Sequence, residues 1–398
     1  VVFLGDSITE QKLYTTYVEA YTLTRFPQWS LTFRNVGWGG DTAWLRQRAH
    51  PDEGALFAAT GSALDEMVTK SVGAGLARDV LPLKPTAVTV DFSMNDHAYQ
   101  AFREDIFRAH VRSQKEIANV LTKNGARVAL MTTQPIEEKR PDPDKDIKNQ
   151  SLGKFSEGIK EVAAKEGVTF VDQFNPYLAL MMKARAAKPD AFIGGGDAVH
   201  PGPAGHTLMA WAILKGLNAP ALVSCACIDV KRWLRSKVVC EKQCTVANVK
   251  VKDGVLSFDR TDAALPMPID ARAVAALQLA PIAEDLNRYL LKVSGLKAAS
   301  YDVSIDGAKV ATLAKEDLAN GFNLATVATP SSQQALQVLD LVFKKNDVYF
   351  NRWRNVQLNN GKPEQLAALD KQIADFEAQI NAARTPKAHH FEIKPAGK

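Results

Sequence analysis

Short apolar segments alternate with amphipathic stretches over roughly the first 220 residues. The apolar segments predict five strands, and residues spaced three and four apart predict helices between them. The strands are expected at 1–4, 31–36, 87–92, 127–132 and 168–171, and the helices at 14–25, 102–121, 147–164 and 204–217. Strands that alternate with helices form a parallel sheet covered on both faces. We therefore expect a three-layer α/β/α domain over residues 1–220.

The pattern changes after Pro220. Strand-like segments then turn at Asp253-Gly254 and Asp306-Gly307, which is typical of hairpins. Helical periodicity returns at 330–350 and 363–383, each beginning at a proline that suits a first helical turn. We expect a β-rich extension over 221–328 and C-terminal helices over 329–398 that pack on the first domain, with 349–354 docking back onto it.

The composition is that of an ordinary globular protein. Of the 398 residues, 46% are hydrophobic and 23% are charged, and the net charge is +5. No basic stripe with interleaved aromatics is present, so nucleic acid is not an expected partner. No apolar run reaches the roughly 18 residues that span a bilayer. The chain begins on a strand-like segment without an initiator Met, and we expect that an upstream segment was removed.

All four cysteines lie close together, as Cys225, Cys227, Cys240 and Cys244. An even number at such close spacing favours two disulfides in an oxidising compartment. A structural zinc site is the alternative, but such sites usually use Cys-x-x-Cys pairs, and the flanking residues resemble paired strands. Disulfides are therefore the favoured interpretation, and they indicate an extracytoplasmic location, periplasmic or secreted.

A candidate nucleophile follows the first strand, in Gly5-Asp6-Ser7-Ile8-Thr9-Glu10. Open α/β sheets bind ligands at the carboxyl ends of their strands, where Ser7 is expected. A serine needs a base, and Asp197 and His200 in Gly196-Asp197-Ala198-Val199-His200-Pro201 can supply one. The alternatives are helix caps for the first block and a metal half-site or capping pair for the second.

Two further blocks offer donors for the oxyanion of an acyl-transfer intermediate. Gly40 lies in Asn35-Val36-Gly37-Trp38-Gly39-Gly40-Asp41-Thr42, where glycines let a backbone N–H approach a ligand. Asn95, in Ser93-Met94-Asn95-Asp96, has a side-chain amide that can donate to the same oxygen. The alternatives are a plain glycine-rich turn and an Asn/Asp turn.

These four blocks, in this order, resemble the SGNH hydrolase superfamily, also called GDSL lipases and esterases. The resemblance implies a flavodoxin-like fold with a parallel five-stranded sheet. It also implies Ser7 as nucleophile, Asp197 and His200 as acid and base, and an oxyanion hole of Ser7, Gly40 and Asn95. The family usually has a glycine where this chain has Ser93, so the position of the asparagine donor could differ slightly. More loosely, the whole chain resembles bacterial secreted members with a C-terminal extension.

The expected function is therefore a serine esterase without metal or organic cofactor, most simply a carbohydrate O-acetylesterase acting on a glycan or small-molecule ester. The alternatives are a lipase or thioesterase for longer acyl chains, a non-catalytic glycan-binding protein that keeps the fold, and a metal-dependent hydrolase. The acyl group, the alcohol and the oligomeric state cannot be derived from these patterns.

Overall fold

A five-stranded parallel sheet organises the first half of the chain in the computed structural model, which describes residues 1–231 and 235–397. Its strand order is β2-β1-β3-β4-β5, the flavodoxin-like order that the resemblance implies. The strands are β1 (Val2–Gly5), β2 (Arg34–Asn35), β3 (Ala87–Asp91), β4 (Arg127–Met131) and β5 (Thr169–Val171). The predicted fold class is thereby confirmed. The edge strand β2 is much shorter than the expected 31–36, because only Arg34 and Asn35 pair with β1.

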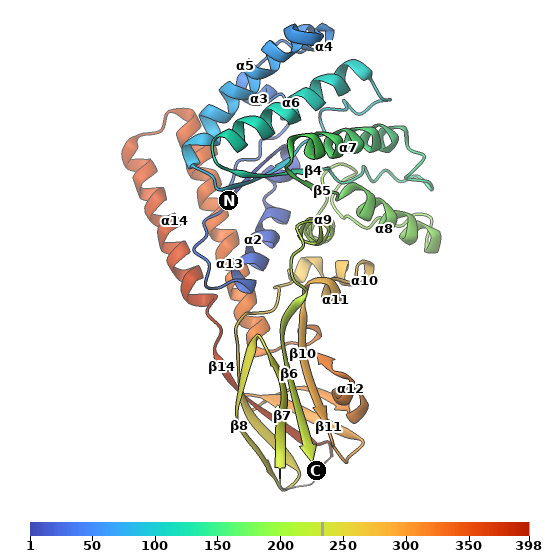
Figure 1. Cartoon of the computed structure of the whole chain (residues 1–398), viewed down its shortest axis with the longest axis vertical. Helices are drawn as coiled ribbons and strands as arrows, with labels where there is room; N and C mark the ends of the chain where they lie inside the picture. Colours follow the sequence, from blue (N-terminus) through green and yellow to red (C-terminus); the bar gives the residue numbers. More distant parts are fainter. Residues whose placement is uncertain (232–234, 398) are drawn as a thin grey trace.

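Helices cover both faces of this sheet, as Figure 1 shows. One face packs against α5 (Gly61–Asp79), α6 (Glu104–Lys123) and α7 (Ile147–Glu166). The other face packs against α2 (Leu13–Arg25), α8 (Phe174–Ala187) and α9 (Pro203–Gly216). Three short helices, α1 (Ser7–Glu10), α3 (Arg46–Ala49) and α4 (Glu53–Ala58), lie in the connections. The hydrophobic patterns did not predict α5 or α8.

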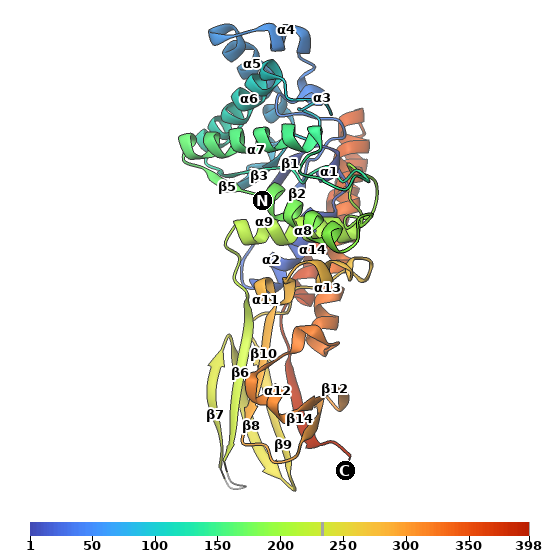
Figure 2. The same cartoon turned by 90° about the vertical axis from the view of Figure 1, so that its right-hand side faces the viewer.

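Two antiparallel-rich sheets build the β-rich body at the other end of the elongated molecule (Figures 1 and 2). One sheet has the order β13-β10-β6-β7 and the other β12-β11-β14-β9-β8, and apolar side chains of both enclose one core. The strands are β6 (Leu222–Lys231), β7 (Arg235–Lys242), β8 (Cys244–Lys252), β9 (Val255–Asp262), β10 (Arg288–Ser294), β11 (Ser300–Ile305), β12 (Ala308–Ala314), β13 (Phe322–Asn323) and β14 (Ala388–Pro395). Short helices α10 (Ala276–Leu279), α11 (Ile282–Leu286) and α12 (Lys315–Asn320) connect them.

Two long helices join the two bodies. Helix α13 (Pro330–Phe350) runs from the β-rich body to the edge of the parallel sheet, and α14 (Pro363–Ala383) runs back beside it (Figure 1). A buried ion pair between Lys345 and Glu19 of α2 fixes α13 on the first domain. The sequence patterns did not predict that the chain would then enter the β-rich body again as β14. The domain boundaries at 220 and 328 stay a prediction.

The cysteines form one disulfide, not the expected two. Cys227 and Cys240 are bonded, because they lie directly opposite each other on β6 and β7 with Cα atoms 4.8 Å apart. Cys225 lies opposite Lys242 and remains a free thiol, as does Cys244. Within the described ranges, no helix is long and apolar enough to cross a membrane.

Candidate active site

Ser7 begins α1 directly after the carboxyl end of β1. The Asp6 carboxylate caps this helix by accepting a hydrogen bond from the Ile8 N–H at 2.9 Å. Gly5 is needed at the end of the strand, because a Cβ there would lie 2.6 Å from the carbonyl oxygen of Asp91 on β3. The tight contact between β1 and β3 thus brings the Ser7 side chain to the carboxyl edge of the sheet, where such folds bind ligands.

The structure brings Ser7 and His200 together across 193 residues of sequence, with Oγ 2.9 Å from Nε2. The other ring nitrogen, Nδ1, lies 3.2 Å from Oδ2 of Asp197. Both side chains are accessible, with 37% of His200 and 65% of Asp197 exposed. Ser7, His200 and Asp197 therefore form a continuous hydrogen-bonded row that opens to solvent.

Backbone hydrogen bonds fix the carboxylate in this row. Oδ1 of Asp197 accepts from the N–H groups of Val199 and His200, both at 2.7 Å. Burial alone would raise the pKa of Asp197, but these bonds and the His200 side chain outweigh it and lower that pKa. The carboxylate is thus held in its charged form, which can orient an imidazole and stabilise its protonated state.

Residues that follow β4 form hydrogen bonds to the loop that carries Asp197 and His200. The Gln134 side chain donates to the carbonyl of Val199 at 2.9 Å, and the Glu137 N–H donates to the carbonyl of Ala198 at 2.8 Å. The buried Glu137 carboxylate accepts two further backbone N–H groups, those of Ile193 and Gly194. The loop therefore has little freedom to carry the imidazole away from Ser7.

Gly40 and Asn95, the two expected oxyanion donors, meet at one loop. Gly40 has a φ of +75°, a conformation that favours glycine. The Asn95 amide nitrogen donates to the carbonyl of Asp41 at 3.0 Å, and the Tyr99 hydroxyl donates to the amide oxygen of Asn95 at 3.1 Å. This loop lies beside the nucleophile, since a Cβ on Gly39 would be 3.9 Å from the Cβ of Ser7.

A buried arginine supports this loop from behind. Arg48 is inaccessible to solvent and pairs with Asp41 at 2.7 Å and with Asp79 of α5 at 2.8 Å. Its third contact is the carbonyl of Val36, at 2.5 Å. Because a buried guanidinium needs all its partners, the three contacts tie the loop to the body of the domain.

The C-terminal helices contribute a contact that the residue patterns did not identify. After α13 the chain forms a wide helical turn, Asn351–Val356, whose Trp353 packs edge-on against Trp38 with ring centroids 5.9 Å apart. The Arg354 guanidinium lies 3.7 Å from the centre of the Trp38 ring and 3.4 Å from the Glu10 carboxylate. The other oxygen of Glu10 accepts the Gly39 N–H at 2.6 Å.

This chain of contacts links the extension to the loop with the glycine donor. The aromatic and basic character of 349–354 predicted that the segment docks on the first domain. Its specific partners, Trp38 and Glu10, could not be read from local sequence. Trp38 is therefore engaged by protein groups, and Trp44 is buried in the core.

A parallel α/β sheet of flavodoxin-like order, with a serine, a histidine and an aspartate aligned at its carboxyl edge, defines the architecture of the SGNH-type serine hydrolases. The model of the GDSL-like lipase/acylhydrolase family matches residues 3–208. The chain belongs to this family, and the protein is a carboxylic ester hydrolase.

Several solved structures are similar to this chain. BT4096, a gut microbial diltiazem-metabolizing enzyme, is 24% identical with a TM-score of 0.82, and the match covers 99% of this chain and 96% of that one. The acetylxylan esterase Axe2 from Geobacillus stearothermophilus is 20% identical over 55% of this chain and 94% of its own, with a TM-score of 0.41. LAE5, an alpha/beta hydrolase from the Lake Arreo metagenome, has the same identity, coverage and TM-score. The first match shows that the whole fold, extension included, occurs in another protein. No curated protein matches the chain.

Proposed function

We propose that Ser7, His200 and Asp197 are the catalytic triad of a serine esterase that removes short acyl groups, foremost O-acetyl groups on carbohydrate. The observation that carries the proposal is the 2.9 Å contact between Ser7 Oγ and His200 Nε2, continued to Asp197 by the second ring nitrogen. This distance lies within the hydrogen-bonding range that proton transfer from a nucleophile requires.

The mechanism follows from these contacts. His200 Nε2 takes the proton of Ser7, and Oγ attacks the ester carbonyl to form a tetrahedral intermediate. The alcohol leaves with the proton from His200, and water, activated by the same imidazole, then releases the acyl group from Ser7. The backbone N–H groups of Ser7 and Gly40 and the amide of Asn95 donate to the oxyanion. Each such donor is worth about 3 kcal/mol of the barrier.

The chemistry around the nucleophile favours a small, polar substrate. The nearest side chains to the Gly39-Gly40 segment are those of Glu10, Arg46 and Gln47, and Tyr99 lies over Asn95 with 37% of its surface exposed. Hydroxyl groups of a sugar find hydrogen-bonding partners here, whereas a long acyl chain needs an apolar trough. A lipase or thioesterase is therefore the second candidate.

The first experiment tests the nucleophile. Ser7→Ala should abolish hydrolysis of p-nitrophenyl acetate and labelling by a fluorophosphonate probe, while Ser62→Ala, an exposed serine on α5, should keep both. Far-UV circular dichroism should be the same for both variants. Retained turnover in Ser7→Ala refutes the assignment, and a wild-type protein silent toward the probe supports a glycan-binding role without catalysis. A chelator should leave the activity unchanged, and its loss would indicate a metal-dependent hydrolase.

A second experiment tests the substrate class. We expect the highest kcat/KM with acetyl esters in a series of p-nitrophenyl esters from two to twelve carbons, and acetate release from acetylated xylose oligomers. A maximum at eight carbons or more would instead favour the lipase candidate.

A further inference from the structure

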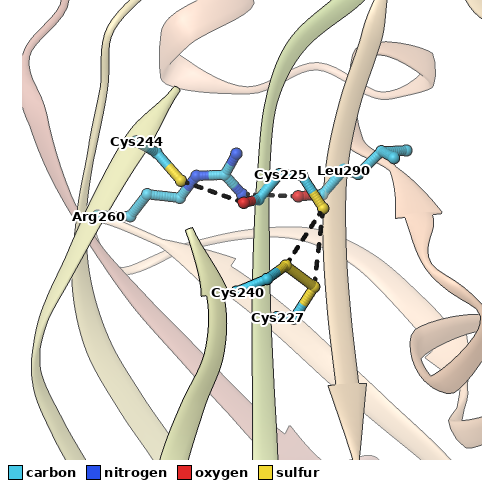
Figure 3. Close-up of a disulfide and its surroundings, with 6 residues drawn as sticks. All are labelled: Cys225, Cys227, Cys240, Cys244, Arg260 and Leu290. Carbon is cyan, nitrogen blue, oxygen red and sulfur yellow. Dashed lines mark hydrogen bonds between the residues drawn. A yellow bond between two sulfur atoms is a disulfide. The ribbon is translucent and has the colours of Figure 1, made fainter. Parts of the chain in front are cut away.

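Three cysteine sulfurs converge on one face of the β-rich body, as Figure 3 shows. Cys225 and Cys227 are two residues apart on β6 and therefore project from the same face of the sheet. Cys240 lies opposite Cys227 on β7. Ser224 and Ala226, which alternate with these cysteines on β6, are completely buried, so the three sulfurs lie on the outer, half-exposed face.

The spacing of these sulfurs suits metal ligation. Cys225 Sγ lies 3.8 Å from Cys227 Sγ and 3.8 Å from Cys240 Sγ. Thiolates bound tetrahedrally to a metal at about 2.3 Å are separated by about 3.8 Å. In the described part of the chain, these three side chains are the only group of three or more cysteine, histidine or acidic residues close enough to share an ion.

The same distances argue against a direct exchange of disulfide partners. A thiolate attacks a disulfide along the line of the sulfur–sulfur bond. Cys225 Sγ is equally far from both sulfurs, so it lies beside the bond and not on its extension. Exchange would therefore require the Cys225 side chain to move, whereas ligation needs only that Cys227 and Cys240 separate.

We propose that Cys225, Cys227 and Cys240 form a three-thiolate site for one thiophilic ion such as Zn²⁺ once the Cys227–Cys240 bond is reduced. A phosphine reductant supplies the two electrons: the sulfur–sulfur bond breaks, each sulfur leaves as a thiol, and phosphorus takes the oxygen of one water molecule. Ligation then releases the thiol protons. The site is separate from the proposed esterase function and does not depend on it.

Cys244 is not part of the site. Its thiol points to the carbonyl of Cys225, with Sγ 3.4 Å from the oxygen, and Figure 3 shows it on the opposite side of β6 from the three sulfurs. The fourth metal position is thus left to water, and Cys244→Ser is a matched control within the same cluster.

The test uses the full chain, reduced with a phosphine without oxygen and then titrated with Cd²⁺ and Zn²⁺. We expect one ion per chain by native mass spectrometry and a thiolate-to-cadmium absorption band in the ultraviolet. Cys244→Ser should bind as the wild type does. Cys225→Ser should bind at least about 100-fold more weakly, because even the loss of an outer-shell partner costs about 10–100-fold in metal affinity.

Cys225→Ser keeps the disulfide in its oxidised form, so its fold can be checked by far-UV circular dichroism before reduction. Cys240→Ser provides a second ligand variant and should lose affinity to a similar degree. The proposal is overturned if the reduced wild type binds no ion, if Cys225→Ser binds as tightly as the wild type, or if Cys244→Ser loses the ion. Loss of the sheet signal on reduction would also overturn it, because the site needs β6 and β7 in register.

Discussion

Removal of the Arg354 side chain should slow catalysis, although Arg354 belongs to the C-terminal part of the chain, far from Ser7 in the sequence. Arg354→Ala removes the ion-pair partner of Glu10 and the guanidinium nearest to the Trp38 ring, beside which Arg48 and Arg78 also lie. Glu10 holds the Gly39 N–H, next to the proposed oxyanion donor Gly40. We therefore expect the glycine loop, the segment around Gly39 and Gly40, to lose order while the contact between Ser7 and His200 remains.

The size of the expected fall in kcat depends on how exposed the contacts of Arg354 with Glu10 and Trp38 are. The Arg354 and Glu10 side chains are 26% and 25% exposed, so the ion pair is partly screened by solvent. A cation at this distance from an indole ring contributes about 0.5–2 kcal/mol, depending on its desolvation. If this energy holds the loop in its transition-state geometry, kcat falls by about 2- to 30-fold. Arg354→Lys should lie between the wild type and Arg354→Ala, because an ammonium keeps the charge but not the planar stacking.

Steady-state kinetics with p-nitrophenyl acetate separate the two parameters. We expect a lower kcat with an unchanged KM, because the loop acts on the oxyanion and not on the bound ester. Arg352→Ala is the matched control: Arg352 is in the same turn but pairs with Asp370 on the surface, and its removal should leave kcat unchanged. An Arg354→Ala enzyme with wild-type kcat, or one in which only KM changes, would refute the coupling.

Three further predictions concern the site and its surroundings. Asn95→Ala should lower kcat by about 10²- to 10³-fold in the same assay through the loss of an oxyanion donor, and a loss below tenfold would remove Asn95 from the oxyanion hole. Gly196→Ala should reduce kcat and destabilise the protein in urea unfolding by more than about 1 kcal/mol. Its Cβ would lie 2.3 Å from the carbonyl oxygen of His200 at a φ of +74°. Gly167→Ala, at a φ of +65° with nothing within 4 Å, should leave kcat unchanged, and equal kcat in both variants would contradict the argument. Burial raises the pKa of Asp91 to about 7. Because the folded state then holds this proton more tightly than the unfolded state, the contribution of Asp91 to stability should be full below pH 4 and fall by about 4 kcal/mol as the pH rises to 7. Asp91→Asn should flatten that dependence in urea unfolding at pH 5 and 8, and an unchanged slope would exclude Asp91 as its source.

The sheet was predictable because its strands are short, apolar and bounded by turns. The two helices that the patterns did not predict, α5 and α8, show where this reasoning fails. Helix α5 contains Gly73 and Gly75, which lower helix propensity. A Cβ on Gly75 would lie 2.6 Å from the Leu45 side chain, so this glycine serves close packing and not a turn. Such a role becomes visible only when the neighbouring segment is placed.

The candidate site was predictable for a topological reason. Ser7, Gly40 and Asn95 each follow a parallel strand, and the carboxyl ends of parallel strands meet at one edge. Asp197 and His200 precede the last helix of the same domain and reach that edge. By contrast, Arg354 and Glu10 are 344 residues apart, and no local pattern indicates where α13 docks. Its position depends on buried partners such as Glu19 and Lys345, whose pairing cannot be read from spacing.

The last strand links the β-rich body to the glycine loop. In β14, His389, Phe391 and Ile393 are buried and the residues between them are exposed, as in a strand with one face on the core. The strand lies between β11 and β9 and is hydrogen-bonded to both. Without it the sheet would separate into two parts, and the β-rich core would lose the side chains of Phe391 and Ile393. Helix α14 is thus anchored at its end by a central strand, and α13 near its C-terminal end by a buried ion pair. Arg354 sits in the turn between two helices that are each held at a distance from it. The loop of Gly39 and Gly40, which Arg48 already ties to the first domain, is thus also linked through Arg354 and the two helices to a body that contributes none of the proposed catalytic residues.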